Sequence, residues 1–160
     1  MYFDFSKAFD SVNHDLLLQK LKLKYNIDGR LLKLIVNYLS EREQCVVIGN
    51  SKSSTVPVLS GVPQGSILGP ILFVLFINDM HSVVSPGTSI ALYADDTKIW
   101  RSILSDMDSI ILNNDIEALN KWASANCMRS HPMKCKVVSI AHKDKNFSNL
   151  PFYNFPYCLS

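Results

Sequence analysis

Two adjacent aspartates, Asp95 and Asp96, lie between two short apolar runs with the composition of β-strands, Ser89–Leu92 and Lys98–Trp100. A short polar segment between two such runs predicts a hairpin, with the carboxylates at its turn. Carboxylates this close repel each other unless water or a cation compensates their charge. Although paired aspartates are also common as solvated turn formers, the segment Tyr93–Asp96 (YADD) is a candidate divalent-metal site.

The composition is that of one ordinary globular domain. The chain has 160 residues, of which 48% are hydrophobic and 19% charged, and a net charge of +2. That length is enough to bury a core, and the sequence contains no repeat or low-complexity tract. A nearly neutral charge does not mark a stand-alone nucleic-acid-binding domain. The longest apolar run, Ile67–Ile77, is shorter than the roughly 20 residues that span a bilayer, so we expect a buried core helix there.

The cysteine pattern predicts neither disulfides nor a zinc site. Cys45, Cys127, Cys135 and Cys158 show no C-x-x-C pairing, and no secretory leader is recognisable, so reduced intracellular thiols are expected. Two of these cysteines and His131 follow one another at four-residue steps. That local pattern lacks a fourth ligand, and its spacing is not that of a zinc finger.

Hydrophobic periodicity and turn signals predict the order β-α-β-β-α-β once insertions are set aside. Asn13 and Ser11 offer N-cap chemistry to the first long helix, Asp28 to the second, and Ser105-x-x-Asp108 reads as a capping box. This order is the split βαβ arrangement, an α+β fold with a four-stranded antiparallel sheet and both helices on one face. The domain is expected to cover residues 1–145, and the aromatic-rich segment 146–160 stays unassigned. The expected strands are 1–5, 45–48, 55–59, 89–92, 98–100 and 136–141, and the expected helices are 14–24, 28–38, 67–80 and 106–123.

A third isolated carboxylate, Asp4, ends the first expected strand. In a split βαβ sheet this strand neighbours the hairpin, so Asp4 is expected to approach Asp95. Mg²⁺ binds a few carboxylates and leaves its other positions to water and phosphate, and two such ions about 3.5–4 Å apart can assist phosphoryl transfer. Each residue alone has a simpler explanation: Asp4 ends a strand, and Asp10 joins a helix N-terminus, where acidic groups are favoured.

Three segments in this order carry a more specific signal. They are Asp4–His14 (DFSKAFDSVNH), Ser60–Leu72 (SGVPQGSILGPIL) and Leu92–Asp96. They resemble the first, second and third palm motifs of reverse transcriptases from LINE-like, non-LTR retrotransposons, and the similarity covers about residues 2–142. The resemblance implies an RNA-directed DNA polymerase acting in retrotransposition. Such an enzyme uses two Mg²⁺ ions, or Mn²⁺ as an alternative, to transfer a nucleotide from a dNTP to a primer 3′-hydroxyl on an RNA template.

The resemblance also implies roles at matching positions. The carboxylates that would bind metal are Asp4, Asp95 and Asp96. The backbone carbonyl of Phe5 would complete the coordination of one ion. Lys134 matches a lysine of the fourth palm motif and would act as general acid or stabilise charge near pyrophosphate, with Lys136 as the alternative. Relatives usually have asparagine where this chain has His131.

Five further residues match positions around the substrate. Phe9 matches the steric gate that crowds the ribose 2′-position and favours dNTPs, while core packing is its simpler interpretation. Gln64 and Gly65 would line the incoming nucleotide and the template. Ala94 would lie beside the primer terminus, with Tyr93 packed near it.

Nothing in the sequence corresponds to the fingers region or the thumb of such polymerases, so a palm fragment is expected. Two other interpretations stay open: an inactive truncated remnant that only folds or binds nucleic acid or protein, and another split βαβ protein. An RNA-binding module would carry aromatic RNP motifs, which are not seen, and the SGVPQGSILGP segment argues against a nucleotide cyclase. A nuclear location follows from the family alone, and no membrane partner is expected.

Overall fold

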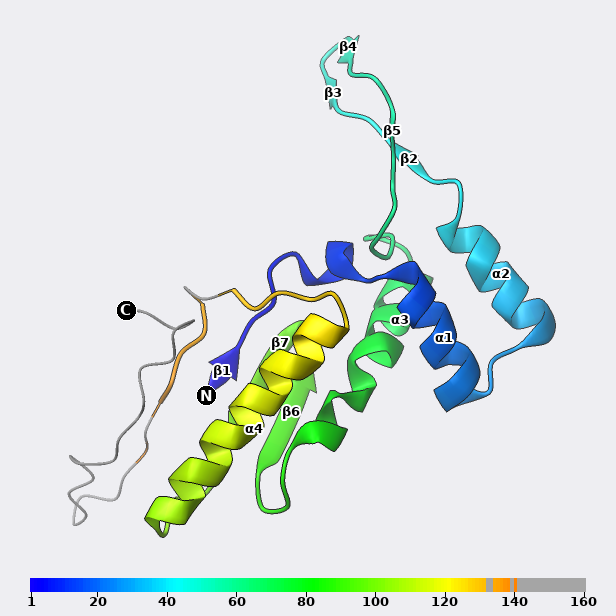
Figure 1. Ribbon diagram of the computed structural model, residues 1–160. Coiled ribbons are helices and arrows are strands. Elements are labelled where there is room, and N and C mark those ends of the chain that lie inside the picture. The colour runs from blue at the N-terminus through cyan, green and yellow to red at the C-terminus, as the bar shows by residue number, and fades with distance from the viewer. Residues whose placement is uncertain (132–133, 139, 141–160) are drawn as a thin grey trace. The chain divides into compact units, whose positions relative to one another are not determined.

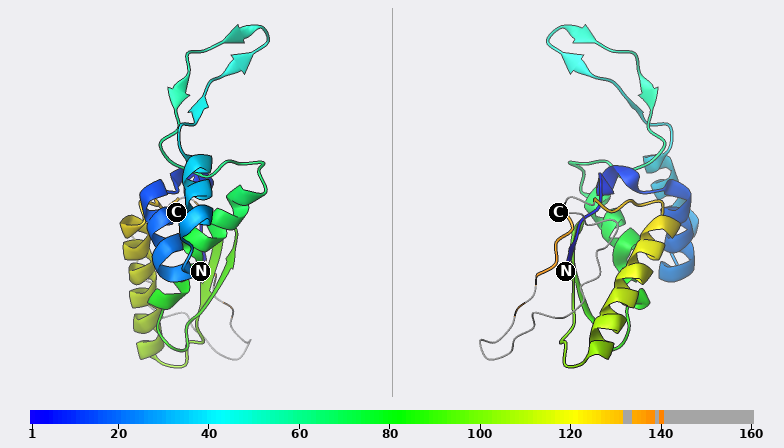
Figure 2. Two further views of the ribbon diagram at one scale, coloured as in Figure 1. Left: turned by 90° about the vertical axis from the view of Figure 1, so that its right-hand side faces the viewer. Right: turned by 60° about the vertical axis from the view of Figure 1, so that its left-hand side comes forward.

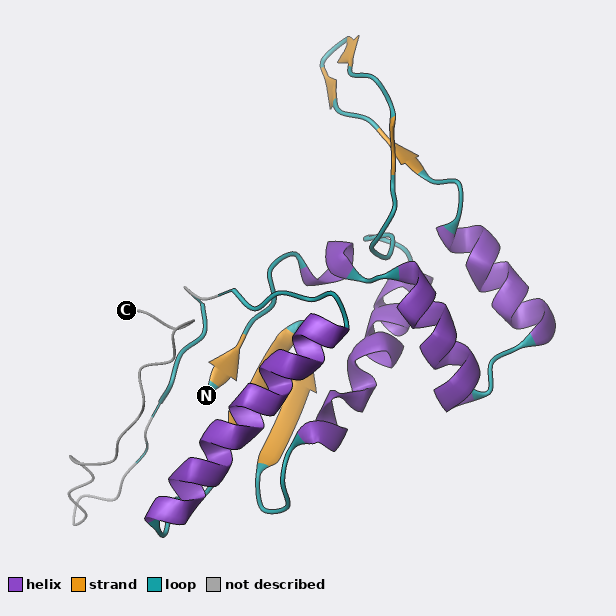
Figure 3. Cartoon of the chain, in the orientation of Figure 1, coloured by secondary structure: helices purple, strands orange, loops and turns teal. Residues whose placement is uncertain are grey.

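The computed structural model describes residues 1–131, 134–138 and 140, which fall into two compact units (Figure 1). The first unit contains residues 1–6 and the described residues from 78 onward, and the second contains residues 7–77. Figure 3 shows that both units combine helices with strands or short ladders. The segment 146–160, which the sequence leaves unassigned, lies outside the described residues.

The first unit is built on an antiparallel sheet. Its strands are β1 (Tyr2–Phe3), β6 (Ser89–Tyr93) and β7 (Asp96–Trp100), in the order β1-β7-β6. Side chains alternate along β7, so that Thr97 and Ile99 are buried while their neighbours are exposed. The predicted hairpin at residues 89–100 is therefore confirmed.

Helix α4 (Asp106–Ala125) lies along one face of this sheet (Figure 1). Its apolar side chains recur at helical spacing on one side, where Ile116, Leu119 and Trp122 are buried and Leu112 is half-buried. The Trp122 indole also donates a hydrogen bond of 3.1 Å to Asp79, in the 3₁₀-helix η2 (Asn78–Val83). Helix α4 thus covers this face of the sheet, and both its buried apolar side chains and the Trp122–Asp79 hydrogen bond hold it in place.

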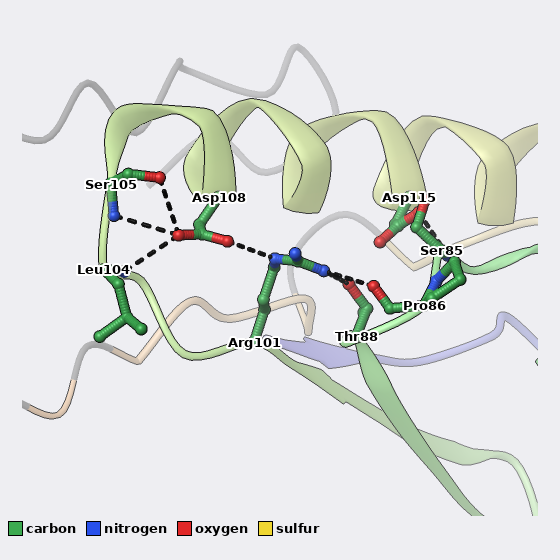
Figure 4. A network of polar contacts seen from close by, with 8 residues as sticks. All are labelled: Ser85, Pro86, Thr88, Arg101, Leu104, Ser105, Asp108 and Asp115. Carbon is green, nitrogen blue, oxygen red and sulfur yellow. Dashed lines mark hydrogen bonds and ion pairs between the residues drawn. The ribbon is translucent and has the colours of Figure 1, made fainter.

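A polar network ties the open end of the hairpin to the start of α4 (Figure 4). Arg101 Nε donates to Asp108 Oδ1 at 3.0 Å, and Arg101 Nη1 donates to the Pro86 carbonyl at 3.0 Å and to Thr88 Oγ1 at 3.1 Å. Asp108 Oδ2 accepts from the Ser105 backbone N–H at 3.0 Å and from its hydroxyl at 2.9 Å. The Ser105 hydroxyl and then the Arg101 guanidinium hold the pKa of Asp108 below its usual range. The predicted capping box is present and also anchors the hairpin.

The second unit begins with helices. They are the 3₁₀-helix η1 (Ala8–Ser11), α1 (His14–Tyr25), α2 (Gly29–Leu39) and α3 (Leu68–Ile77), with α1 in contact with both α2 and α3. The Asn13 side chain accepts the Leu16 N–H at 3.0 Å and starts α1, as its N-cap chemistry predicts. Asp28 does stand at the N-cap of α2, but its side chain makes no capping hydrogen bond there.

Helix α3 is less buried than its apolar sequence predicts. Leu72, Phe73 and Phe76 are buried, whereas Ile71 and Val74 are each 51% exposed. A helix that is apolar all round is expected to be enclosed, but within the described residues only one side of α3 is packed. The helix predicted at 67–80 therefore has one buried and one exposed side. It ends at Ile77, earlier than predicted, and is followed by η2.

The strands predicted on either side of Gly49 form shorter ladders than expected. β2 (Glu43–Gln44) pairs with β5 (Val56–Pro57), and β3 (Val47–Ile48) pairs with β4 (Ser51–Lys52). Figure 2 shows the two ladders following one another along a single long hairpin. The side chain of Ile48 is 76% exposed, so its β-propensity is not reinforced by packing, and isolated hairpins are marginally stable.

The described residues support the predicted α+β class with antiparallel pairing, but they do not establish the four-stranded split βαβ sheet. Of the strand predicted at 136–141, Lys136 forms an isolated bridge with Tyr2, while residues 137, 138 and 140 are not in a strand and 139 and 141 lie outside the description. A second isolated bridge joins Phe5 to Ser130. In the part of the chain that the structure describes, no helix is long and apolar enough to cross a membrane.

Candidate active site

The pairing of β1 with β7 brings Asp4 to the YADD hairpin. In an antiparallel register each step forward along β1 is a step back along β7, so continuing the pairing by one residue beyond Phe3 would set Asp4 opposite Asp96. On that continuation the two side chains would share the face opposite Thr97, which is buried, because side chains alternate along a strand. The register pairs that fix this are Tyr2 with Lys98 and Phe3 with Thr97.

The hairpin turn itself has an uncommon backbone. β6 and β7 pair as far as Tyr93 and Asp96, which leaves Ala94 and Asp95 as the turn residues. Ala94 has a φ of +51°, a left-handed conformation that costs about 1–2 kcal/mol in a residue with a Cβ. Strain of this kind concentrates at functional sites. The turn thus holds Asp95 between Asp96 and an exposed Tyr93, whose side chain is 84% accessible.

Asp4 is largely enclosed and its charge is only partly compensated. Its Oδ2 lies 3.5 Å from Lys134 Nζ, and its side chain is 17% exposed. Its Oδ1 is buried without a hydrogen-bond partner among the described residues, as is Nδ1 of His131. The His131 backbone N–H donates to the Asp4 carbonyl at 2.8 Å. A buried carboxylate oxygen without a partner is costly, so Asp4 has an unused oxygen that a cation would satisfy.

These donors suit a hard divalent cation in type. All three carboxylates offer oxygen, the ligand that Mg²⁺ prefers. Phe5, whose carbonyl is the fourth candidate ligand, is held by ring contacts with Phe3 at 5.1 Å and with Trp122 at 6.4 Å. In residues 1–131, 134–138 and 140, however, no three His, Cys, Asp or Glu side chains are already gathered as a metal-binding group.

The second motif is fastened to the first within the second unit. The Gly61 N–H donates to the Val12 carbonyl at 2.8 Å, and the Val62 N–H donates to the Phe9 carbonyl at 2.9 Å. His14 Nε2 lies 2.8 Å from the Gly61 carbonyl. These bonds hold the SGVPQG segment against the chain that follows Asp4.

Gly61 is required by this close approach. Its φ is +86°, and a Cβ there would lie 2.7 Å from Cα and 2.9 Å from the carbonyl oxygen of Asp10. Three residues further on, the Gln64 side-chain amide donates to Asp10 Oδ1 at 2.9 Å. Gly65 has a φ of +80° with open space around it, so its backbone conformation rather than crowding explains the glycine.

The turn that leads into α3 contains residues that the sequence did not single out. Ser66 Oγ donates to the Pro63 carbonyl at 2.7 Å and accepts from the Gly69 N–H at 3.0 Å. The Tyr38 hydroxyl donates to Ser66 Oγ at 2.6 Å. A serine three residues before a glycine at a helix start is a local capping signal, but its partnership with Tyr38 depends on the tertiary fold.

Phe9 packs where its simpler interpretation predicts. Its ring stacks on Phe73, with centroids 4.2 Å apart and an interplanar angle of 20°. Phe73 is fully buried and Phe9 is half-buried. The ring of Phe9 therefore has a fixed position whether or not its open edge also meets a substrate.

Residues 1–152 of the chain match the model of the reverse transcriptase (RNA-dependent DNA polymerase) family. The chain belongs to this family. This agrees with the order of the DFSKAFD, SGVPQG and YADD segments, which lie at the end of β1, in the turn before α3 and in the β6–β7 hairpin.

Its relatives come from mobile elements. The chain is 35% identical over 151 residues to the RNA-directed DNA polymerase from mobile element jockey of Drosophila melanogaster, a match to 89% of this chain and 16% of that protein. It is 29% identical over 141 residues to a probable RNA-directed DNA polymerase from transposon BS of the same species, with 84% and 15% covered. It is 24% identical over 144 residues to a Retrovirus-related Pol polyprotein from type-1 retrotransposable element R2 of Popillia japonica, with 86% and 24% covered.

The chain thus spans between 15% and 24% of the length of these relatives. The resemblance to reverse transcriptases of non-LTR retrotransposons, predicted from three motifs, is confirmed.

Proposed function

We propose that this chain is the catalytic palm part of an RNA-directed DNA polymerase that acts in retrotransposition. Its substrates are an RNA template, a DNA primer and dNTPs, and its reaction is nucleotidyl transfer to the primer 3′-hydroxyl. The observation that carries the proposal is the β1–β7 register, whose continuation by one residue would bring Asp4 opposite Asp96, next to the turn that contains Asp95. Family membership and the names of the relatives support the same chemistry.

The residues of the first unit supply the charge for this reaction. Asp4, Asp95 and Asp96, with the Phe5 carbonyl, would hold Mg²⁺ or Mn²⁺. Two bound divalent ions supply stabilisation of the negative charge that develops on the attacking and leaving oxygens. Lys134 Nζ lies 3.5 Å from Asp4 Oδ2, and this lysine would act as general acid toward the pyrophosphate or stabilise its charge.

The residues of the second unit would select the nucleotide. Gln64 and Gly65 stand on a segment whose backbone is fixed by hydrogen bonds, which favours close contact with a base pair. Phe9 would exclude a ribose 2′-hydroxyl, because its stack on Phe73 prevents the ring from moving aside. On the hairpin of the first unit, Ala94 and Tyr93 would contact the primer terminus.

Primer extension by a chimaera tests the proposal. In it, this chain replaces the matching segment of the jockey polymerase of Drosophila melanogaster, and DNA synthesis is followed on a primed RNA template with dNTPs and Mg²⁺. Asp95→Asn is expected to lower the rate by more than about 100-fold, the scale for losing one preorganised charge-stabilising group. Asp106→Asn, the same change at an exposed residue in the first turn of α4, serves as the matched control and is expected to leave the rate unchanged.

Two outcomes would contradict the proposal. Equal extension by the wild-type and Asp95→Asn chimaeras would remove Asp95 from the metal site. A folded wild-type chimaera that extends no primer, although the unmodified jockey polymerase does so, would favour the alternative of an inactive remnant that only folds or binds nucleic acid or protein. Circular dichroism of each chimaera establishes that it is folded.

A further inference from the structure

Asp10 contacts the second motif, although it is not one of the carboxylates of the proposed metal site. It follows Asp4 by six residues and is exposed. Its Oδ1 accepts a 2.9 Å hydrogen bond from the Gln64 side-chain amide, and its backbone carbonyl accepts a 2.8 Å bond from the Ser60 hydroxyl. A single residue of the first motif thus contacts both ends of the SGVPQ segment.

The backbone around this pair is fixed independently of the two side chains. Gly61 lies so close to Asp10 that a Cβ would meet its Cα at 2.7 Å. The Gly61 and Val62 N–H groups donate to carbonyls of the first motif at 2.8 Å and 2.9 Å. Main-chain contacts therefore hold the backbone of Asp10 and of Gly61 and Val62, two residues before Gln64, and the side-chain bond is the printed contact that orients the Gln64 amide.

The chemistry of the pair selects one orientation of the amide. An ionised carboxylate only accepts hydrogen bonds, whereas the glutamine amide has a donor end and an acceptor end. With its NH₂ group turned to Asp10, Gln64 has its carbonyl oxygen Oε1 turned away from that carboxylate. Without this hydrogen bond, the terminal torsion of a glutamine is broad and roughly two-fold. The amide would then present either its NH₂ group or its carbonyl oxygen to a substrate.

We propose that Asp10 is a positioning residue for nucleotide selection, which orients the Gln64 amide so that Oε1 accepts a hydrogen bond from the incoming deoxynucleoside triphosphate. The proposal rests on the function proposed above for Gln64 as a residue that lines this nucleotide. Both side chains are exposed, so the bond contributes little to folding. Its effect belongs to substrate binding.

The size of the effect follows from the freedom that Gln64 gains. A free glutamine has two three-well torsions and one two-fold torsion, about 18 conformers in all. If Asp10 is absent and these conformers are about equally populated, the binding-competent one falls to roughly a twentieth of the population, and the apparent affinity falls by about the same factor. Asp10→Ala is thus expected to raise the KM for dNTP about 20-fold with little change in kcat. Asp10→Asn, which permits two amide orientations, is expected to raise it only about 2-fold.

The kinetic test uses the chimaera and a double-mutant cycle. Asp15→Asn is the matched charge control, because Asp15 is exposed in the first turn of α1 in the same unit. In a Gln64→Ala background, Asp10→Ala is expected to have no further effect on KM, since Asp10 acts through Gln64. An unchanged KM for Asp10→Ala, or the same rise in KM with and without Gln64, would overturn the proposal.

A second measurement does not depend on polymerase activity. In NMR spectra of the 160-residue chain, the two side-chain NH₂ protons of Gln64 are expected to have well-separated shifts, because one is hydrogen-bonded to a carboxylate. Asp10→Ala is expected to bring them to the values of a free amide, and Asp15→Asn is not. Free-amide shifts in the wild-type chain would overturn the pairing itself. If the chimaera is inactive, the proposed function fails, but the NH₂ shifts still show whether Asp10 and Gln64 are hydrogen-bonded.

Discussion

Gly61→Ala is expected to destabilise the chain more than a glycine-to-alanine change at another left-handed position. Gly61 has a φ of +86°, and an added Cβ would lie 2.7 Å from Cα and 2.9 Å from the carbonyl oxygen of Asp10. Both atoms belong to the backbone, so no side-chain rotation relieves the overlap. The left-handed φ costs about 1–2 kcal/mol and overpacking about 1–3 kcal/mol. The expected loss of unfolding free energy is therefore about 3 kcal/mol.

Gly29→Ala separates the two contributions. Gly29 has a φ of +58°, but an added Cβ would have nothing within 4 Å of it, so only the backbone cost of about 1–2 kcal/mol is expected. Equilibrium unfolding in urea, followed by far-UV circular dichroism, gives both values for the 160-residue chain. A loss for Gly61→Ala no greater than that for Gly29→Ala would refute the close approach of the SGVPQG segment to Asp10.

Three further predictions concern Asp108, Phe9 and Tyr25. Because the pKa of Asp108 is lowered in the fold, its ionised carboxylate stabilises the chain above about pH 4, and this stability is lost as the pH falls through the lowered pKa. In urea titrations, Asp108→Asn should therefore make the unfolding free energy depend less on pH below about pH 4. An unchanged dependence on pH would contradict the role of the bond from Arg101 to Asp108. Phe9→Ala in the chimaera is expected to raise ribonucleotide incorporation relative to dNTP by at least about 10-fold, whereas unchanged selectivity would leave Phe9 a packing residue. Tyr25→Phe removes the 2.9 Å hydrogen bond from the hydroxyl to the Leu75 carbonyl and should lower the unfolding free energy, measured in urea, by about 1 kcal/mol. An unchanged unfolding free energy would mean that water satisfies the Leu75 carbonyl equally well.

The elements that the sequence predicts well are those whose signals are local. Asn13 begins α1 and Ser105 begins α4, because a capping side chain acts within one turn of the chain. The hairpin at 89–100 follows from two apolar runs and a polar turn. The position of Asp4 beside this hairpin is expected only from the topology, and the β1–β7 register is what supports it.

What could not be predicted depends on partners distant in the chain. The bond from Gln64 to Asp10 joins residues 54 apart, and that from Tyr38 to Ser66 joins residues 28 apart. No local pattern encodes such pairs. The length of β3 could not be predicted for the same reason. Its valine and isoleucine favour a long strand, but strand formation also depends on packing, and Ile48 is 76% exposed.

The metal site is the central claim, and its location can be measured directly. Mn²⁺ broadens NMR signals of nearby nuclei, so titrating it into the ¹⁵N-labelled chain maps any bound ion without the rest of the polymerase. The prediction is selective broadening at the end of β1 and at the turn around Ala94, which Asp95→Asn abolishes and Asp106→Asn leaves intact. Broadening centred on other acidic residues, or the same broadening in the Asp95→Asn chain, would contradict a metal centre formed by Asp4, Asp95 and Asp96.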